Sequence, residues 1–303
     1  MKTSKILPFV LLAPALIMIV FAQLYPALYT FYLSAQEMDA GVQKFVGMEN
    51  FRRVFDSSAF VESAWNTVIF IAGYILLTML LGMGLALLLN RKLKFSGFYL
   101  AMLFIPWVLS DVIVGLVWKL FVDPDTGLFS PILELPFFGL EGAALLTKVP
   151  TDRLFDSIPF PPAPALIYLI IASVWKALPF VTLLMLAALQ TVPKEVLESA
   201  QMDGANSRQS FLGITFPMIL PSLIVALFNL VLGGMNGVGM VFSLTGGGPG
   251  TSTEVLSYLL YSIGFAQFDF GKAAALSVFI AMINLALILL ALRVSRQGAE
   301  QYA

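Results

Sequence analysis

Residues 193–221 read PKEVLESAQMDGANSRQSFLGITFPMILP and separate two long apolar segments of the chain. They carry a dense run of charged and amide side chains, whereas 59% of all residues in the chain are hydrophobic. Unsatisfied polar groups cost several kcal/mol each in lipid, so a polar insert between two membrane spans has to lie in water. The stretch therefore predicts an aqueous connection between two membrane-spanning helices.

The first half of this stretch has the pattern of a short amphipathic helix. Pro193 suits the first helical position, and the charge of Glu195 is favourable in the first turn of a helix. Apolar residues recur on one face at helical spacing, namely Val192, Val196, Leu197 and Ala200. The pattern suits a helix that another protein grips, although an ordinary loop helix fits the amphipathicity equally well.

A glycine and a capping residue predict the end of this helix and the start of the next one. Gly204 is expected to break the helix, and Asn206 or Ser207 to cap a second helix that re-enters the membrane. We therefore expect residues 191–211 to form a loop that contains a helix, a glycine turn and a second helix entry.

The composition of the whole chain predicts a membrane protein and excludes chemistry that depends on cysteine or histidine. Only 12% of its 303 residues are charged, against about a quarter in soluble globular proteins. Cys and His are both absent, which excludes disulfides and thiolate catalysis and removes the commonest general base and metal ligand. A net charge of −1 gives no reason to expect nucleic-acid binding.

Six apolar segments predict six transmembrane helices. A span needs about 20 apolar residues, and the candidates are residues 6–33, 65–89, 99–121, 165–189, 211–242 and 273–292. The first follows Lys2 and Lys5, as in a signal peptide, but its apolar run exceeds the roughly 7–15 residues of such a peptide, which favours a retained helix. We expect an all-α polytopic membrane protein with a single transmembrane domain over residues 1–303.

The distribution of basic residues predicts that both termini are cytoplasmic. The short turn between the second and third spans carries Arg91, Lys92 and Lys94 and no acidic residue, which fits the positive-inside rule. Arg52 and Arg53 argue for the opposite orientation, but they lie in a longer, mostly acidic segment.

Three loops follow from this topology. The 191–211 loop is expected to be cytoplasmic. Residues 122–164, rich in Asp, Glu, Pro and Gly, and residues 243–271, rich in Gly, are expected to form extracytoplasmic loops. Glycine runs of this kind break helices and leave the backbone flexible.

Two charged residues fall near the middles of predicted spans. Asp111 lies in the third span and Lys176 in the fourth, and each would cost about 2.5–3.5 kcal/mol if it faced lipid. Both are therefore expected to face the protein interior, either as an ion pair or as groups that line a substrate path.

The polar stretch also resembles a known family motif. Glu198-Ser199-Ala200, Gly204 and Ile214-Thr215-Phe216-Pro217 are similar to the pattern EAA, three residues, G, nine residues, I-x-L-P. That pattern marks the permease subunits of binding-protein-dependent ABC importers, and Asp203-Gly204-Ala205 resembles their carbohydrate branch of maltose and glycerol-phosphate permeases. The sequence departs from the pattern at Ser199, which replaces Ala, and at Phe216, which replaces Leu.

Other segments share this resemblance over roughly residues 47–292. The matching segments are Asn66-Thr67, Asp123–Leu128, the run Thr245–Gly250 followed by Thr253-Glu254, and Phe268–Ala274. The resemblance implies the type I ABC importer permease fold in the cytoplasmic (inner) membrane of a bacterium or archaeon.

The resemblance also implies partners and a division of labour. This chain would lie in the lipid bilayer with a second homologous permease, two ATPase subunits and an extracytoplasmic sugar-binding protein, and would pass a carbohydrate. The sequence has no G-x-x-x-x-G-K-[ST] phosphate loop, so this chain is not expected to be an enzyme or to bind a cofactor. ATP and Mg²⁺ would bind at the partner ATPase subunits.

Two groups of site residues follow from the motif and from side-chain chemistry. The ATPase-coupling residues implied by the family motif are Glu198, Ser199, Ala200, Asp203, Gly204, Ala205, Ile214 and Pro217. Amides and hydroxyls suit a sugar that leaves water, and aromatic rings stack on pyranose faces. The residues expected along the substrate path are Asp111, Trp175, Lys176, Phe180, Asn229, Asn236, Ser277 and Asn284.

The substrate and two other functional classes stay open at this stage. Lys176 is the one cation expected in the path, which favours a neutral sugar over a phosphorylated one. A stand-alone secondary transporter or channel, in which Asp111 and Lys176 relay protons, is the main alternative, and a membrane scaffold without transport is another.

Overall fold

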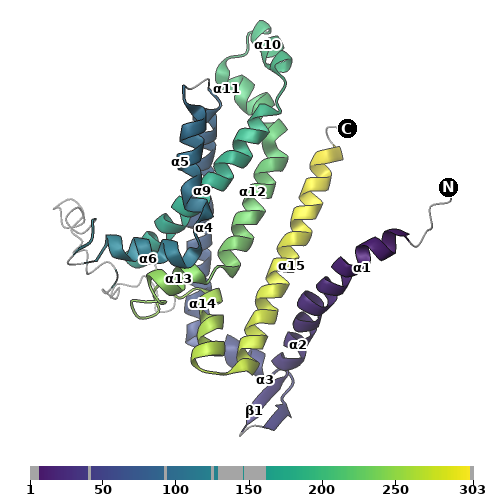
Figure 1. Cartoon of the computed structure of the whole chain (residues 1–303), viewed down its shortest axis with the longest axis vertical. Helices are drawn as coiled ribbons and strands as arrows, with labels where there is room; N and C mark the ends of the chain where they lie inside the picture. Colours follow the sequence, from purple (N-terminus) through teal and green to yellow (C-terminus); the bar gives the residue numbers. More distant parts are fainter. Residues whose placement is uncertain are drawn as a thin grey trace. The chain divides into compact units, whose positions relative to one another are not determined.

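The computed structural model describes residues 7–39, 42–91, 94–123, 126–128, 146 and 162–300. The chain packs as two compact units, one of Met1–Phe60 with Leu260–Ile283 and the other of Val61–Leu259 with Asn284–Ala303. Figure 1 colours the elements along the sequence.

The amino-terminal unit begins with an apolar helical stretch that contains a π-helical turn. Its parts are α1 (Leu7–Ile19), η1 (Val20–Leu24) and α2 (Tyr25–Ser34). Pro14 lies inside α1 and Pro26 in the first turn of α2, and proline removes a helical hydrogen bond, which accounts for an irregular winding between them. Leu11–Ser34 is long and apolar enough to cross a membrane, and most of its side chains are exposed on the surface of the chain.

A short hairpin and a short helix follow in the same unit. Strands β1 (Gln36–Asp39) and β2 (Val42–Phe45) pair antiparallel, with Gln36 opposite Phe45, and α3 spans Glu49–Phe55. The prediction of an all-α chain therefore needs a small correction, because the chain is mostly helical with one two-stranded hairpin. The strands are shorter than the usual five to six residues or so, and their alternation is too brief to stand out in the sequence.

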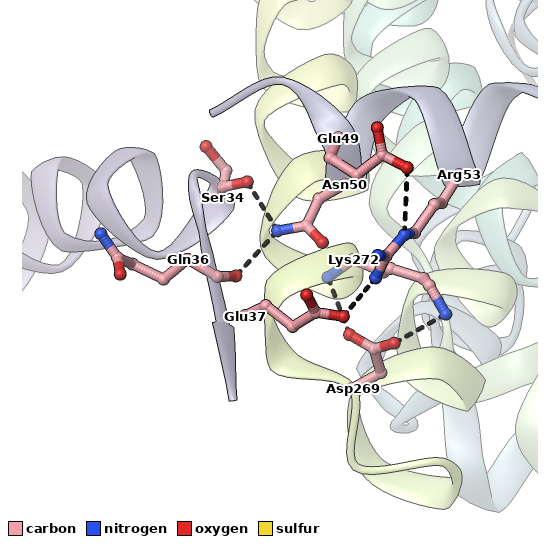
Figure 2. Close-up of polar contacts among 8 residues, drawn as sticks. All are labelled: Ser34, Gln36, Glu37, Glu49, Asn50, Arg53, Asp269 and Lys272. Atoms are coloured by element: carbon pink, nitrogen blue, oxygen red, sulfur yellow. Dashed lines mark hydrogen bonds and ion pairs between the residues drawn. The ribbon is translucent and has the colours of Figure 1, made fainter. Parts of the chain in front are cut away.

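A buried asparagine joins the parts of this unit (Figure 2). The Nδ2 of Asn50 donates to the carbonyl oxygens of Ser34 at 2.9 Å and of Gln36 at 2.8 Å. The long helix α15 (Phe270–Glu300) begins beside them, and a Cβ added to Gly271 would lie 2.4 Å from the Gln36 oxygen. Only glycine fits this close contact between β1 and α15.

Ion pairs surround this asparagine on the surface of the unit. Arg53 bonds Glu49 at 3.3 Å and also Glu37, and Lys272 bonds Asp269 at 2.7 Å (Figure 2). The hydrogen bond to Glu37 raises the pKa of Arg53 further above its ordinary value. Exposed pairs of this kind contribute little stability each, and of the three only the Arg53–Glu37 pair joins α3 to the hairpin.

The second unit is built from long apolar helices. Its elements are α4 (Ser58–Leu89, whose first residues belong to the first unit), α5 (Ser96–Val108), α6 (Asp111–Phe121), α9 (Pro164–Gln190), α10 (Lys194–Met202), α11 (Ser207–Ser210), η2 (Phe211–Thr215), α12 (Phe216–Asn236), α13 (Gly239–Leu244) and α14 (Leu256–Tyr261, which continues into the first unit as η3, Ser262–Ala266). More than half of the span of α9 is buried inside the chain. Helix α9 is therefore the centre of this unit.

Two apolar clusters pack against α9. One joins it to α6 and α13 through Trp118, Tyr168 and Leu244, and the Tyr168 hydroxyl donates to the Trp118 carbonyl at 2.6 Å. The other joins α9 to α4 and α12, where a Cβ on Gly82 would lie 2.8 Å from Val181. Close packing of small against branched residues is typical of helices in membranes, where lipid supplies no hydrophobic driving force.

The third predicted span is not a continuous helix, which corrects the prediction for residues 99–121. Helices α5 and α6 are bent by 99° at Leu109 and Ser110, both of which have extended backbone conformations. The Ser110 hydroxyl accepts a hydrogen bond from the Ile113 N–H at 3.3 Å and caps α6. Asp111 therefore lies in the first turn of a helix and not in the middle of one, where its charge favours the helix dipole.

The fifth predicted span, residues 211–242, is also interrupted. Helix α12 ends at Asn236, Gly237 adopts an extended conformation, and α13 starts at Gly239. Glycine weakens a helix because it loses more backbone freedom than other residues. Among the described residues, five helices are long and apolar enough to cross a membrane, or six if the bent α5–α6 pair counts as one span.

Candidate functional site

The polar stretch forms two short helices that connect α9 with α12. Pro193 has an extended ψ of 135° and precedes α10 as its N-cap, one residue before the predicted position. Gly204 has a φ of +83°, a left-handed conformation that favours glycine, and it ends the α10 segment as predicted. In Figure 1, α10 and α11 lie beyond the ends of α9 and α12, and α6 and α13 lie toward the opposite ends.

Helix α11 starts with a reciprocal pair of hydrogen bonds. The Asn206 side chain accepts from the Gln209 N–H at 2.9 Å, and the Gln209 side chain accepts from the Asn206 N–H at 2.9 Å. This capping box satisfies two backbone donors that a helix terminus leaves unpaired. The prediction that Asn206 or Ser207 caps this helix is confirmed, with Asn206 as the cap.

The predicted coupling residues differ in exposure. Glu198, Ser199, Asp203 and Gly204 are exposed, Ala205, Ile214 and Pro217 are half-buried, and Ala200 is buried inside the chain. Among the described residues, no ion pair involves Glu198 or Asp203. Met202, at the end of α10, is 88% exposed. The helix pair thus presents charge and one flexible apolar side chain to its surroundings, while Ala200 lets α10 pack closely on its own chain.

A cavity of about 210 Å³ lies inside the second unit. Its wall is formed by α4, α5, α6, α9, α12 and α13, and its polar lining side chains are Tyr74, Asp111, Ser173, Lys176 and Asn229. Gly233, Gly234 and Gly237 complete the wall on the α12 side. Because glycine has no side chain, the cavity reaches the backbone of α12 here.

An ion pair crosses this cavity. The Lys176 Nζ lies 2.6 Å from the Asp111 Oδ1, and the two side chains are 23% and 43% exposed. The break before α6 and the middle of α9 bring the two residues together. A Cβ on Gly239 would lie 3.0 Å from the Asp111 Cβ, so the small residue at the start of α13 makes room for Asp111. The expectation of an ion pair is confirmed, and both residues line this cavity; that they line a substrate path stays a prediction.

An aromatic pair forms another part of the wall. The ring of Phe180 on α9 faces the ring of Trp107 on α5, with centroids 6.2 Å apart and planes 11° apart. The sequence did not predict that Trp107 lines the cavity. Its position three residues before Ser110, which caps α6, could have indicated a place near the helix break. Trp175 was predicted to lie on the path, but it packs edge-on against Trp118 and is not among the lining residues.

Of the remaining residues predicted on the path, one lines the cavity and the others do not. Asn229 lines the cavity. Asn236 and Asn284 lie outside the lining, and the Asn284 Nδ2 donates to the Asn236 Oδ1 at 3.1 Å. Ser277 belongs to the first unit, on α15. Ser173, one turn before Lys176 on the same face of α9, lines the cavity and was missed.

Residues 78–297 of the chain match a family model described as "Binding-protein-dependent transport system inner membrane component". The chain belongs to this family. The matched segment includes both the α10–α11 connection and most of the cavity wall.

Curated relatives cover nearly the whole of this inner membrane component. It is 34% identical over 291 residues to the sn-glycerol-3-phosphate transport system permease protein UgpA of Agrobacterium fabrum, covering 94% of this chain and 92% of the relative. It is 32% identical over 295 residues to the trehalose/maltose transport system permease protein MalF of Thermococcus litoralis, covering 96% and 94%.

A solved structure has the same fold. A chain of a bacterial ABC transporter involved in the import of the acidic polysaccharide alginate superposes with a TM-score of 0.78 at 25% identity, over 96% of this inner membrane component and 95% of that chain. The prediction of a type I ABC importer permease fold is confirmed by this similarity and by the family match.

The glycine-rich segment of this inner membrane component is held by hydrogen bonds. The Thr253 hydroxyl donates to the Gly248 carbonyl at 2.7 Å. From α4, the Asn66 Nδ2 donates to the carbonyls of Thr251 at 2.9 Å and Glu254 at 3.0 Å. Such a network restrains a segment whose composition alone suggests flexibility.

Two carboxylates lie close together in this network. The Thr251 hydroxyl donates to the Glu62 Oε2 at 2.5 Å. Burial raises the pKa of Glu254 above its ordinary value, and the neighbouring charge of Glu62 raises it further. Ionised Glu254 is therefore disfavoured in the folded chain.

Proposed function

We propose that this chain is the membrane-spanning subunit of an ATP-driven sugar importer, in which it forms half of the translocation path and couples that path to a separate ATPase. The family membership and the permease relatives support the transport role. The names of the relatives include both an anionic solute, glycerol 3-phosphate, and neutral sugars, trehalose and maltose. They support a polyhydroxylated substrate and leave its charge open.

The observation that carries the proposal is the path of the chain from the α10–α11 segment to the cavity. Helix α9 ends just before α10 and carries Lys176 and Phe180, and α12 starts just after η2 and carries Asn229. Lys176 lies 14 residues before Gln190 (190 − 176), or about 21 Å along a helix that rises 1.5 Å per residue. A rigid displacement of α10 is therefore transmitted by two helices to opposite parts of the cavity wall.

In this proposal, exposed residues of the α10–α11 segment contact the ATPase. A closing ATPase dimer with bound ATP and Mg²⁺ would grip α10, with Glu198 and Asp203 as polar anchors and Gly204 as the turn. Movement of α9 and α12 would open the cavity outward, and ADP release would return it to face inward. The 210 Å³ cavity is smaller than the about 300–1,000 Å³ of typical ligand sites, as expected if a second homologous permease supplies the other half.

The topology proposed for the membrane keeps both termini and residues 191–211 in the cytoplasm. Residues 122–164 and 243–271 then lie outside, where an extracytoplasmic sugar-binding protein delivers the carbohydrate. Much of the 122–164 loop lies outside the described residues. The family name supports a location in the inner membrane of a bacterium or archaeon.

The ion pair in the cavity also favours one alternative, a proton-coupled secondary transporter that works without an ATPase. The two functions are separated by reconstitution into vesicles. The full complex with the second permease, the ATPases and the binding protein is expected to accumulate sugar only with ATP on the ATPase side. Uptake by this chain alone, driven by a proton gradient, would refute the importer proposal.

Docking is tested in the same complex by crosslinking. A cysteine placed at Glu198 is expected to crosslink to the ATPase subunit, and one placed at Thr251 is not. Because the chain has no native Cys, each crosslink reports one position. A crosslink from Glu198 to the extracytoplasmic binding protein would show that the orientation is wrong.

A further inference from the structure

The cavity has balanced charges. Among its lining residues in the described part of the chain, Lys176 is the one cation and Asp111 the one anion, and they bond each other at 2.6 Å. The other polar lining groups, Tyr74, Ser173 and Asn229, are uncharged side chains by type. A solute in the cavity therefore meets a dipole rather than a net charge.

The pair limits what Lys176 can bind. An ammonium has three donors and an ionised carboxylate has only acceptors. A hydroxyl can accept from Lys176 and donate to Asp111, so a polyol satisfies both without separating them. A phosphate, sulfonate or carboxylate can only accept, and Asp111 repels it at short range.

The neighbouring groups suit the same kind of ligand. The Ser173 hydroxyl donates to the Leu169 carbonyl at 2.8 Å and keeps its acceptor lone pairs for a ligand. Among the described residues no hydrogen bond is formed by the Asn229 amide, which offers two donors and one acceptor. The stacked rings of Trp107 and Phe180 add an apolar surface beside these groups.

We propose that Asp111 is a specificity-determining residue: by neutralising Lys176 it makes the cavity accept uncharged polyhydroxylated solutes and discriminate against anionic ones. This inference rests on the proposed transport function. It selects one class from the two that the relatives' names leave open. Discrimination arises from a repulsive group placed beside an attractive one, which is how many specific sites exclude a competitor.

The experiment compares solutes that differ only in charge. The purified complex of this chain, the second permease and the ATPases, without the binding protein, is titrated with trehalose and trehalose 6-phosphate and with glucose and glucose 6-phosphate. Fluorescence of Trp107, which lines the cavity, reports binding, and a Trp107→Phe variant removes that signal. The wild-type complex is expected to bind the neutral member of a pair at least about tenfold more tightly than its phosphate, because like charges in close contact are strongly unfavourable.

Asp111→Asn tests the role of charge at constant size. It is expected to tighten binding of the phosphorylated member about tenfold, with affinity that falls as salt is added, and to leave the neutral member within about threefold. Adding Lys176→Gln to this variant is expected to abolish the gain. Lys119→Gln, which removes a charge from the same helix outside the cavity lining, is the control and is expected to change neither affinity.

The outcomes separate this inference from the proposed function. If Asp111→Asn leaves the ratio of the two affinities within twofold of wild type, or if the wild-type complex prefers the phosphate, the specificity role of Asp111 is refuted while sugar transport stands. If the wild-type complex binds neither neutral solute and accumulates no sugar with ATP, the proposed function fails and the inference with it. A wild-type complex that prefers the phosphate refutes the inference even where a variant does not assemble.

Discussion

The α10–α11 segment and the cavity both depend on polar residues, but they satisfy those residues in different ways. The charged side chains of α10 are exposed, and the order of the segment comes from short-range features: the turn at Gly204 and the capping box at Asn206. In the cavity, Asp111 and Lys176 come from separate helices and bond each other. Water solvates the charges of the α10–α11 segment. In the cavity, lipid and protein solvate charges poorly, so Asp111 and Lys176 must neutralise each other.

Because the two regions are ordered differently, they can respond differently when a partner or a solute binds. A segment ordered by local bonds keeps its shape when it moves as a body, which suits a contact that transmits force. A cavity ordered by contacts between helices changes when any of those helices moves, which suits a site that must release its solute.

The contrast is tested most severely at Gly204. Gly204→Asp is expected to reduce ATP-driven uptake at least about a hundredfold, because it adds a charged side chain at the turn after α10 and strains a left-handed residue by about 1–2 kcal/mol. A Cβ at this position meets nothing within 4 Å of the chain, so the assembled complex is expected to persist. Uptake and co-purification of the ATPase are the measurements.

Gly97→Asp is the matched control for this variant. Gly97 lies in the first turn of α5, also has open space around its Cβ position, and tolerates an acidic residue there. We expect its uptake to stay within about twofold of wild type. Wild-type uptake by the Gly204 variant would remove α10–α11 from the coupling mechanism.

In the cavity, removal of one charge is expected to affect stability more than coupling. Lys176→Met leaves Asp111 unpaired and is expected to destabilise the unit by about 1–2 kcal/mol, less than the 3–5 of a fully buried pair, because Asp111 is 43% exposed. Thermal unfolding of the complex measures the change.

The double variant Lys176→Met with Asp111→Leu is expected to recover more than half of that loss, since an apolar pair replaces an ion pair at little cost. Lys119→Met, outside the cavity, serves as the control. A single variant as stable as wild type would mean that the ion pair does not neutralise an otherwise costly charge.

Two caps of similar strength allow the regions to be compared directly. Asn206→Ala and Ser110→Ala each remove a helix N-cap, and each is expected to cost about 1 kcal/mol locally. Asn206→Ala should lower uptake per ATP hydrolysed and leave solute binding unchanged. Ser110→Ala, next to Asp111, should weaken solute binding and leave uptake per ATP at saturating solute unchanged. If both variants changed uptake per ATP, or both changed solute binding, the α10–α11 segment and the cavity would not have separate roles.

The smallest expected effect is a pH dependence at a third place, Glu254. Because the pKa of Glu254 is raised in the folded chain above its ordinary 4.5, ionisation there favours unfolding. Stability is thus lost as the pH rises through the raised pKa. Relative to Glu254→Gln, the wild-type melting temperature should fall as the pH rises above the ordinary pKa of 4.5.

Glu195→Gln, at an exposed carboxylate on α10, is the control for this titration. The difference between wild type and the control variant is expected to show no comparable fall over the same pH range. A flat difference for Glu254→Gln as well would show that its burial does not matter for stability.

The sequence predicted the α10–α11 segment well because its signals are local. Gly204, Asn206 and the amphipathic pattern each act within a few residues, and the one error, the position of Pro193, is a shift of one residue. The family match confirms the transporter class that the motif there indicated. The roles of the individual coupling residues stay predictions.

The cavity was predicted only in part because its geometry depends on helix breaks. Val108 and Leu109 are apolar, so the hydropathy showed no sign of the helix break after them. Neither the bend nor the place of Trp107 in the cavity wall was predicted. Asn236 and Ser277 have suitable chemistry, but the structure does not include them in the cavity lining. Residue type alone does not specify which face of a helix reaches a cavity.

Gly271 has a practical consequence for genetics. Since an added methyl group would overlap the Gln36 oxygen and approach the Asn50 amide at 2.9 Å, even alanine has to push the hairpin away from α15. Such a displacement weakens the first unit, whereas the cavity and α10 belong to the second. Codon 271 is therefore a promising place to seek a temperature-sensitive allele, which would let growth on the transported nutrient be switched off by warming the culture.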